Sequence, residues 1–90
     1  MTANVLVVDD IEANIKLLEA KLLGEYYTVF TANNAKDALN VLAINRIDIV
    51  LLDAMMPDMD GFETCRRIKS NISTMHIPVI MVTALSDTED

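Results

Sequence analysis

Three apolar runs in this chain end in polar side chains that can bind a metal ion or a phosphate. Residues 5–8 (VLVV) lead into Asp9 and Asp10, residues 49–52 (IVLL) lead into Asp53, and residues 79–82 (VIMV) lead into Thr83. If the runs are parallel strands, their carboxyl ends lie along one edge of a sheet, in the crevice where ligands bind. Carboxylates that cluster there repel each other and need a cation, and hard oxygen ligands suit Mg²⁺. The sequence therefore predicts a metal-assisted phosphoryl site.

Strand-like and helix-like segments alternate along the chain. Short apolar runs predict strands at residues 5–8, 28–32, 47–52 and 79–82, and helical spacing of apolar residues predicts helices at 11–23, 35–44 and 60–71. Alternation of this kind implies a parallel sheet with right-handed crossovers. We predict an α/β fold with four strands and three helices, in a single domain over residues 1–90.

Local signals mark the ends of the predicted helices. The first helix has its apolar residues at Ile11, Ile15, Leu18 and Leu22, and Gly24 is its expected stop. Asn33 and Asn34 predict a turn and a cap before the second helix. The third helix is predicted to begin with a capping box at Asp60 and Glu63, to face Phe62, Cys65 and Ile68 inward, and to present Arg66, Arg67 and Lys69 to solvent in its last turns.

Composition excludes several functional classes. The formal net charge of −7, with seven Lys and Arg against 14 Asp and Glu, argues against general nucleic-acid binding. No apolar run approaches the roughly 18 residues that span a membrane. The first four residues carry no basic region of a secretory signal, and the single Cys65 forms no intrachain disulfide. We expect a cytoplasmic, globular protein.

The motifs together resemble a response-regulator receiver domain. The matching segments are VLVVDD at 5–10, LLDAMMPDMDG at 51–61 and PVIMVTA at 78–84. The stretch at 9–22 (DDIEANIKLLEAKL) is more narrowly similar to the first receiver of PleD-type regulators, which carry a diguanylate cyclase output domain. The resemblance implies a flavodoxin-like sheet in the order 2-1-3-4.

The resemblance also implies a role for each site residue. Asp53 would be the phosphoacceptor for a sensor histidine kinase or phosphotransfer protein. Asp10 would bind Mg²⁺ directly, Asp9 directly or through water, and Met55 through its backbone carbonyl. Thr83 would hydrogen-bond the phosphoryl group and act as the switch. The implied residues around them are small Ala84, which keeps the phosphate accessible, and Pro57 and Gly61, which shape the loop after the phosphoacceptor.

One departure from the family pattern affects the functional prediction. The family carries an essential Lys at the end of a fifth strand, and the sequence given stops at Asp90, before the family's last helix, strand and helix. The domain is therefore interpreted as truncated at its C-terminus. A bare fourth-strand edge and a partly bare sheet face would favour self-association. The alternative function is a receiver-like interaction or dimerisation module that is not efficiently phosphorylated.

Two enzyme classes are alternatives to the receiver domain. A phosphotransferase of the haloacid dehalogenase type also uses a strand-end Asp with Mg²⁺, but it expects a second Asp two residues later, where Met55 stands. A nucleotide-binding enzyme would need a glycine-rich phosphate loop after a strand, and none is present in the sequence. The domain itself is therefore predicted not to be an enzyme, although its parent protein could be a cyclase.

Overall fold

The structure, a computed structural model, describes residues 3–54 and 61–82 of the chain. Its elements in chain order are β1 (Asn4–Val8), α1 (Glu12–Gly24), β2 (Thr28–Ala32), α2 (Ala35–Ile44), β3 (Ile49–Asp53), α3 (Gly61–Ser70) and β4 (Val79–Val82). The alternation predicted from the sequence is confirmed. Within these residues, no helix is both long enough and apolar enough to span a membrane.

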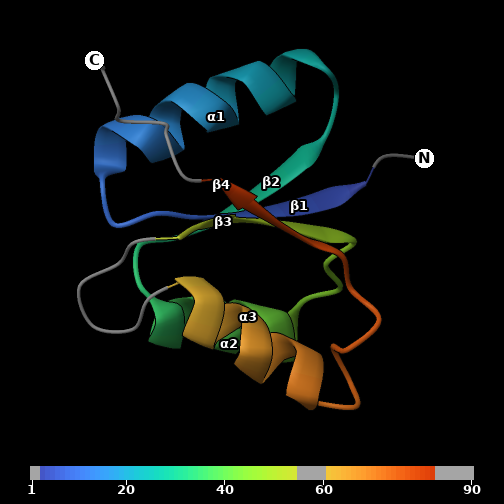
Figure 1. The fold of residues 1–90 in the computed structure, drawn as a ribbon. Helices are drawn as coiled ribbons and strands as arrows, with labels where there is room; N and C mark the ends of the chain where they lie inside the picture. Colours follow the sequence, from blue (N-terminus) through green and yellow to red (C-terminus); the bar gives the residue numbers. More distant parts are fainter. Residues whose placement is uncertain (1–2, 55–60, 83–90) are drawn as a thin grey trace.

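The strands form one parallel sheet in the order β2-β1-β3-β4, as predicted (Figure 1). β1 pairs with β2 and with β3, and β3 pairs with β4. The register places Val8 beside Leu52 and Asp53 beside Val82. The carboxyl ends of β1 and β3 are therefore adjacent, which is what a shared site requires.

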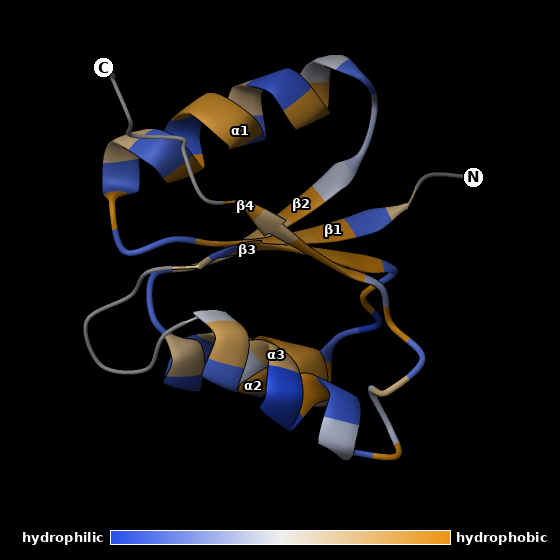
Figure 2. Cartoon of the chain, viewed as in Figure 1, coloured by the Kyte–Doolittle hydropathy of each residue, from blue (hydrophilic) through white to orange (hydrophobic). Residues whose placement is uncertain are grey.

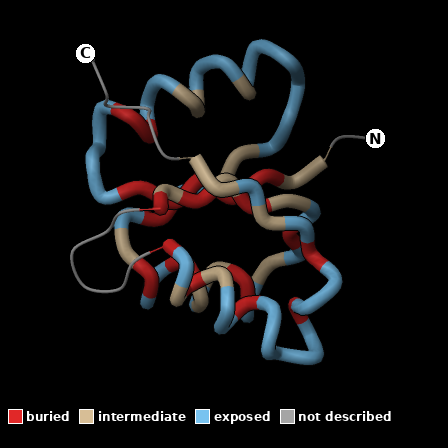
Figure 3. The backbone as a smooth tube through the Cα atoms, viewed as in Figure 1, coloured by how far each residue is buried: buried red, intermediate tan, exposed pale blue. Residues whose placement is uncertain are grey.

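Helices cover both faces of the sheet, with α1 on one face and α2 and α3 on the other (Figure 1). Alternate residues of the central strands supply the two cores. The core under α2 and α3 contains Leu6, Val8, Val50 and Leu52, and the core under α1 contains Val5 and Val7 with Leu51 partly buried. The apolar colouring of the strands in Figure 2 and the buried segments at the middle of the sheet in Figure 3 follow from this arrangement.

The helix α2 begins where its sequence predicts. Asn34 is the N-cap residue, and its Oδ1 accepts a hydrogen bond of 2.8 Å from the backbone N–H of Asp37. This bond satisfies one of the N–H groups that a helix start leaves without a partner. Ala35, Ala38 and Leu42 then lie buried against the sheet. The predicted cap and helix bounds are both confirmed.

The predicted bounds of α1, 11–23, lie one residue early at each end. The apolar spacing puts Ile11 on the buried face, but Ile11 is the N-cap, its backbone is extended, and its side chain is exposed. The helix ends at Gly24, the predicted stop, but Gly24 does not supply the left-handed turn that follows. The left-handed residue is Tyr26, with φ 68°, and the N–H groups of Tyr26 and Tyr27 donate to the carbonyls of Leu23 and Leu22. These bonds form a Schellman motif, which usually has Gly at the position of Tyr26.

The buried face of α3 differs from the predicted one. Gly61, Thr64 and Ile68 are buried at helical spacing, whereas Phe62, predicted to face inward, is 64% exposed. The reason is that Phe62 lies about 100° around the helix from Gly61, which contacts the sheet instead. Cys65 is partly buried against the core, as predicted. Asp60, the predicted cap, lies outside the described residues.

The basic residues of α3 have two kinds of partner. Arg66 and Arg67 form ion pairs with Glu63 on the exposed face of the helix, as the solvated-face prediction implies. The Nζ of Lys69 instead donates to the backbone carbonyls of Met75, at 3.2 Å, and Ile77, at 2.5 Å. Lys69 therefore ties the end of α3 to the loop that leads into β4.

The strand β3 begins two residues later than predicted. Asp48, inside the predicted strand, bonds with Asn4 at the start of β1 instead. Its backbone N–H donates to the Asn4 carbonyl at 2.8 Å, and its Oδ2 accepts from the Asn4 N–H at 2.7 Å. Ile47 is buried, although it precedes the strand. The apolar pattern therefore predicts the burial of Ile47 correctly, but it places the start of β3 too early.

Candidate metal and phosphoryl site

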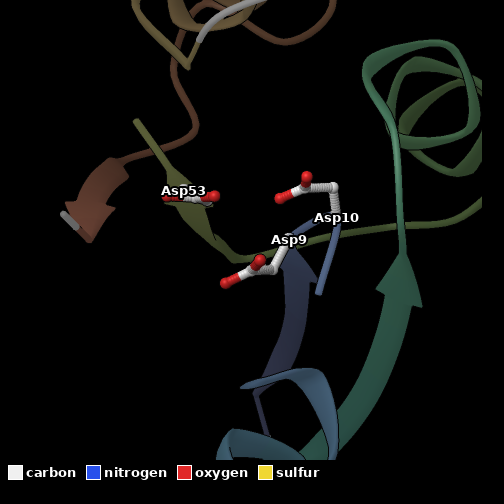
Figure 4. Close-up of side chains that lie close together, drawn as sticks. All are labelled: Asp9, Asp10 and Asp53. Carbon is white, nitrogen blue, oxygen red and sulfur yellow. The ribbon is translucent and has the colours of Figure 1, made fainter. Parts of the chain in front are cut away.

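Three carboxylates meet at the carboxyl ends of β1 and β3 (Figure 4). Asp9 and Asp10 follow β1 directly, and Asp53 is the last residue of β3. One carboxylate oxygen from each lies within 4.8 Å of the others. The prediction that these three side chains lie close together is confirmed, because neighbouring parallel strands must end at the same edge.

The three carboxylates differ in their exposure to solvent. Asp9 is buried, with 2% of its surface exposed, Asp53 is half-buried, and Asp10 is exposed. Solvent exposure therefore increases across the site from Asp9 through Asp53 to Asp10. Asp10 and part of Asp53 are thus accessible to a small ligand.

Asp9 is held by hydrogen bonds on both of its carboxylate oxygens. Oδ1 accepts from the backbone N–H of Ile11 at 2.9 Å, and Oδ2 accepts from Nδ2 of Asn14 at 3.1 Å. The backbone N–H of Asp9 donates to the carbonyl of Ala32 at the end of β2. These bonds offset part of the cost of burying a carboxylate and fix its orientation.

The charge of the cluster favours a divalent cation. Three carboxylates this close repel one another, and even in a solvent-like medium each pair costs about 1 kcal/mol at such separations. Carboxylate oxygens are hard donors that suit Mg²⁺, which commonly takes one or two carboxylates as direct ligands and keeps several waters, to which a further carboxylate can hydrogen-bond. The donor set therefore fits Mg²⁺, and Asp9, Asp10 and Asp53 are the side chains that would hold it.

Gly61, the first residue of α3, lies next to the site. The backbone N–H of Gly61 donates to the Ala54 carbonyl at 2.7 Å. A Cβ on Gly61 would overlap the carbonyl oxygen of Asp53 and would lie 2.5 Å from Cα of Ala54. Glycine is therefore required here by the close approach of two backbones.

The remaining predicted site residues lie outside the described part of the chain. These are Met55 and Thr83, with Pro57 and Ala84. Their roles stay predictions.

Sequence reasoning missed one residue that the structure places at the site. Asn14 is buried and bonds to Asp9. The available signal was a polar residue between the apolar positions Ile11 and Ile15 of a predicted helix face.

Comparison with known proteins identifies the class. Residues 5–90 match the family model of the response regulator receiver domain, and the chain belongs to that family. The response regulator PleD of Caulobacter vibrioides is 56% identical to it over 90 residues, which are the whole of this chain and 20% of the relative. The chain thus spans about a fifth of the length of such curated relatives.

Solved structures agree with this fold. The N-terminal domain of a response regulator receiver protein from Methanoculleus marisnigri has a TM-score of 0.88 and 41% identity, and the match covers 90% of this chain and 66% of that one. The receiver domain of a sensor histidine kinase from Pseudomonas aeruginosa has a TM-score of 0.86 and 27% identity, covering 100% of this chain and 74% of that one. That second structure has a magnesium ion coordinated in its active-site cleft.

Proposed function

We propose that this domain accepts a phosphoryl group on Asp53 in a two-component phosphorelay. The observation that carries the proposal is the convergence of Asp9, Asp10 and Asp53 at one edge of the sheet. Membership of the receiver family supports it. The donor would be a phosphohistidine of a sensor histidine kinase or phosphotransfer protein.

The chemistry assigned to the chain's own residues is nucleophilic. A carboxylate oxygen of Asp53 attacks phosphorus in line, forming an O–P bond while the P–N bond to the donor histidine breaks and its electron pair leaves with the imidazole. The product is a mixed anhydride on Asp53. Asp53 is half-buried, so part of the residue is accessible to the donor.

The proposed cofactor is Mg²⁺ held by Asp9, Asp10 and Asp53, with the Met55 backbone carbonyl as a further ligand. When bound, Mg²⁺ supplies positive charge that offsets the carboxylates and the phosphoryl oxygens. The magnesium site of the Pseudomonas aeruginosa receiver supports this choice. Thr83, which follows β4 in the sequence, is proposed to hydrogen-bond the phosphoryl group and act as the switch.

We assign the docking surface for the donor to the outer face of α1. Its sheet-facing residues include Ile15, but Ile11 and Leu17 are apolar and exposed. Ile11, the N-cap of α1, follows Asp10 directly and so lies beside the acidic cluster, whereas Leu17 is exposed further along the helix. Apolar side chains beside a charged site are typical of the centre of a protein–protein interface. A partner helix seated there would bring its histidine toward Asp53.

The proposed output of the parent protein is a diguanylate cyclase. The support is the 56% identity to PleD together with the PleD-like sequence at residues 9–22. A second relative, from Vibrio cholerae, is a probable cyclic di-GMP phosphodiesterase and is 45% identical over 86 residues. Both similarities favour a role in cyclic di-GMP signalling.

A second candidate function is a receiver-like dimerisation module that is not efficiently phosphorylated. The observation that favours it is on β4, the edge strand of the described sheet, where Ile80 is 48% exposed. An apolar side chain on an open strand edge favours pairing with another copy. Light scattering across a dilution series tests this candidate, since a monodisperse monomer would contradict it.

Intact-mass spectrometry tests the phosphoacceptor proposal. The chain is incubated with Mg²⁺ and acetyl phosphate beside Asp53→Asn and Asp48→Asn, the latter a control carboxylate at the opposite end of β3. We expect one added phosphoryl group in the wild-type chain and in Asp48→Asn, and none in Asp53→Asn. The wild-type chain with EDTA should also gain none. Modification of Asp53→Asn would refute the assignment of Asp53. A folded wild-type chain that stays unmodified would favour the dimerisation module.

A further inference from the structure

The side chain of Asn14 is buried beside the acidic cluster, in the first turn of α1. It is 8% exposed, and its Nδ2 donates to Oδ2 of Asp9 at 3.1 Å. The other oxygen of Asp9 accepts from the backbone N–H of Ile11. Asp9 therefore has one fixed donor on each oxygen, and one of these donors comes from a side chain that mutation can remove.

The pair Asn14–Asp9 replaces the usual arrangement at a helix start. Ile11 is the N-cap of α1 and offers no side-chain hydrogen bond, so Asn14 is the third helical residue. That position commonly holds Glu or Gln, which reaches back to the N-cap N–H. Here Asp9 already accepts from the Ile11 N–H, and a carboxylate at position 14 would face Asp9 with like charge. An amide donor is the group that this position can use.

An uncharged donor suits a cation site in a way that a basic residue does not. A Lys or Arg at position 14 would neutralise Asp9 and reduce the attraction of the cluster for a metal ion. The amide of Asn14 fixes the orientation of Asp9 and leaves its charge in place. Lys16, two residues on, pairs instead with Glu12 at 3.7 Å on the exposed side of α1.

We propose that Asn14 is a positioning residue that makes this site prefer Mg²⁺ over Ca²⁺. The Ile11 N–H holds Oδ1 of Asp9 and Asn14 holds Oδ2, so both oxygens are engaged and bidentate chelation of a cation by Asp9 would compete with both bonds. Removing Asn14 frees Oδ2 for such chelation. Ca²⁺ takes six to eight oxygen ligands and accepts bidentate carboxylates, whereas Mg²⁺ keeps an octahedron with several waters. The inference rests on the proposed function, since it assumes that the cluster binds Mg²⁺.

The test compares metal affinities by isothermal titration calorimetry with MgCl₂ and with CaCl₂. Asn14→Leu removes the donor and keeps the branched shape, and Asn14→Gln restores an amide. Asn45→Leu is the matched control, because the Nδ2 of Asn45 donates to the Val41 carbonyl at the end of α2, outside the acidic cluster. Thermal melts in EDTA give the stability of each metal-free variant.

We expect Asn14→Leu to weaken Mg²⁺ binding about tenfold or more, as removal of an outer-shell partner does, and to weaken Ca²⁺ binding much less. The preference for Mg²⁺ should therefore fall, and Asn14→Gln should recover part of it. Asn45→Leu should lower the melting temperature and leave both dissociation constants unchanged. If Asn14→Leu does not fold, Asn14→Ser, whose hydroxyl is too short to reach Asp9, replaces it in the same comparison.

The outcomes separate this inference from the function on which it rests. A wild-type chain without saturable Mg²⁺ binding would refute both. A wild-type chain that binds Mg²⁺, with a folded Asn14 variant whose Mg²⁺ and Ca²⁺ affinities are unchanged or fall by the same factor, would refute only the role of Asn14. A melting-temperature change without a change in metal preference would give Asn14 a purely structural role.

Discussion

Gly61 lies against the backbone of Asp53, so closely that a Cβ at residue 61 would overlap the Asp53 carbonyl oxygen. The same Cβ would lie 2.8 Å from Cε of Met81 on β4. The start of α3 is thus packed onto the end of β3, on the residue proposed to accept the phosphoryl group. The relationship links the stability of the fold to the geometry of the site.

Gly61→Ala should therefore destabilise the protein and displace Asp53. Overpacking against a backbone that cannot move aside costs about 1–3 kcal/mol. Urea denaturation measures the loss, and Mg²⁺ titration of the folded variant measures the displacement. The matched control is Gly24→Ala, where an added Cβ meets nothing within 4 Å and should stabilise α1 by about 0.5–1 kcal/mol. Equal effects of the two substitutions would contradict the steric argument.

Tyr26→Gly is expected to stabilise the protein by about 0.5–1 kcal/mol. Tyr26 has φ 68° and is 82% exposed, so its side chain gains little burial in return for a left-handed backbone. Glycine removes that strain, although it also adds entropy to the unfolded chain. The control is Glu25→Gly, at φ −100°, which should be destabilising. A lower urea midpoint for Tyr26→Gly would show that the tyrosine ring contributes more than its exposure indicates.

The sheet and the acidic cluster were predictable from sequence because each depends on a simple pattern. A short apolar run gave β4 with its bounds unchanged, and alternation with helices gave the parallel connections. Once the strands are parallel, their carboxyl ends share an edge, so Asp9 and Asp53 had to lie close together. Burial of strand residues and convergence of strand ends follow from the same pattern.

The prediction errors occur where the spacing of apolar residues carries no information about the backbone conformation. Ile11 fits the apolar spacing of α1, but it is the N-cap and its extended backbone turns its side chain away from the buried face of the helix. Gly24 looks like a stop, yet the left-handed turn falls at Tyr26 because the last carbonyls of α1 bond there. Asn14 was missed because its partner, Asp9, comes from the end of a strand, which spacing within a helix cannot show.

Lys69→Met should lower the free energy of unfolding by about 1–3 kcal/mol. Lys69 donates to two backbone carbonyls in the loop before β4, and hydrogen bonds from a charged group are among the stronger ones. Lys36→Met, an exposed site on α2, is the control for the loss of charge. Amide exchange at Val50, whose N–H donates to the Pro78 carbonyl, should quicken in Lys69→Met alone. Equal exchange in both variants would mean that the loop does not depend on Lys69.

Asp10→Asn is expected to stabilise the metal-free domain and to abolish most of its response to Mg²⁺. Asp10 is the exposed member of the cluster, so removing its charge relieves a repulsion of about 1 kcal/mol after solvent screening. For the wild-type chain, Mg²⁺ at 100 times the dissociation constant of the complex should raise the free energy of unfolding by about 2.7 kcal/mol. Thermal melts in EDTA and in MgCl₂ measure both effects, with Glu25→Gln as a control for net charge. If Asp10→Asn kept the full Mg²⁺ response, the cation would be bound elsewhere, and the proposed site would be wrong.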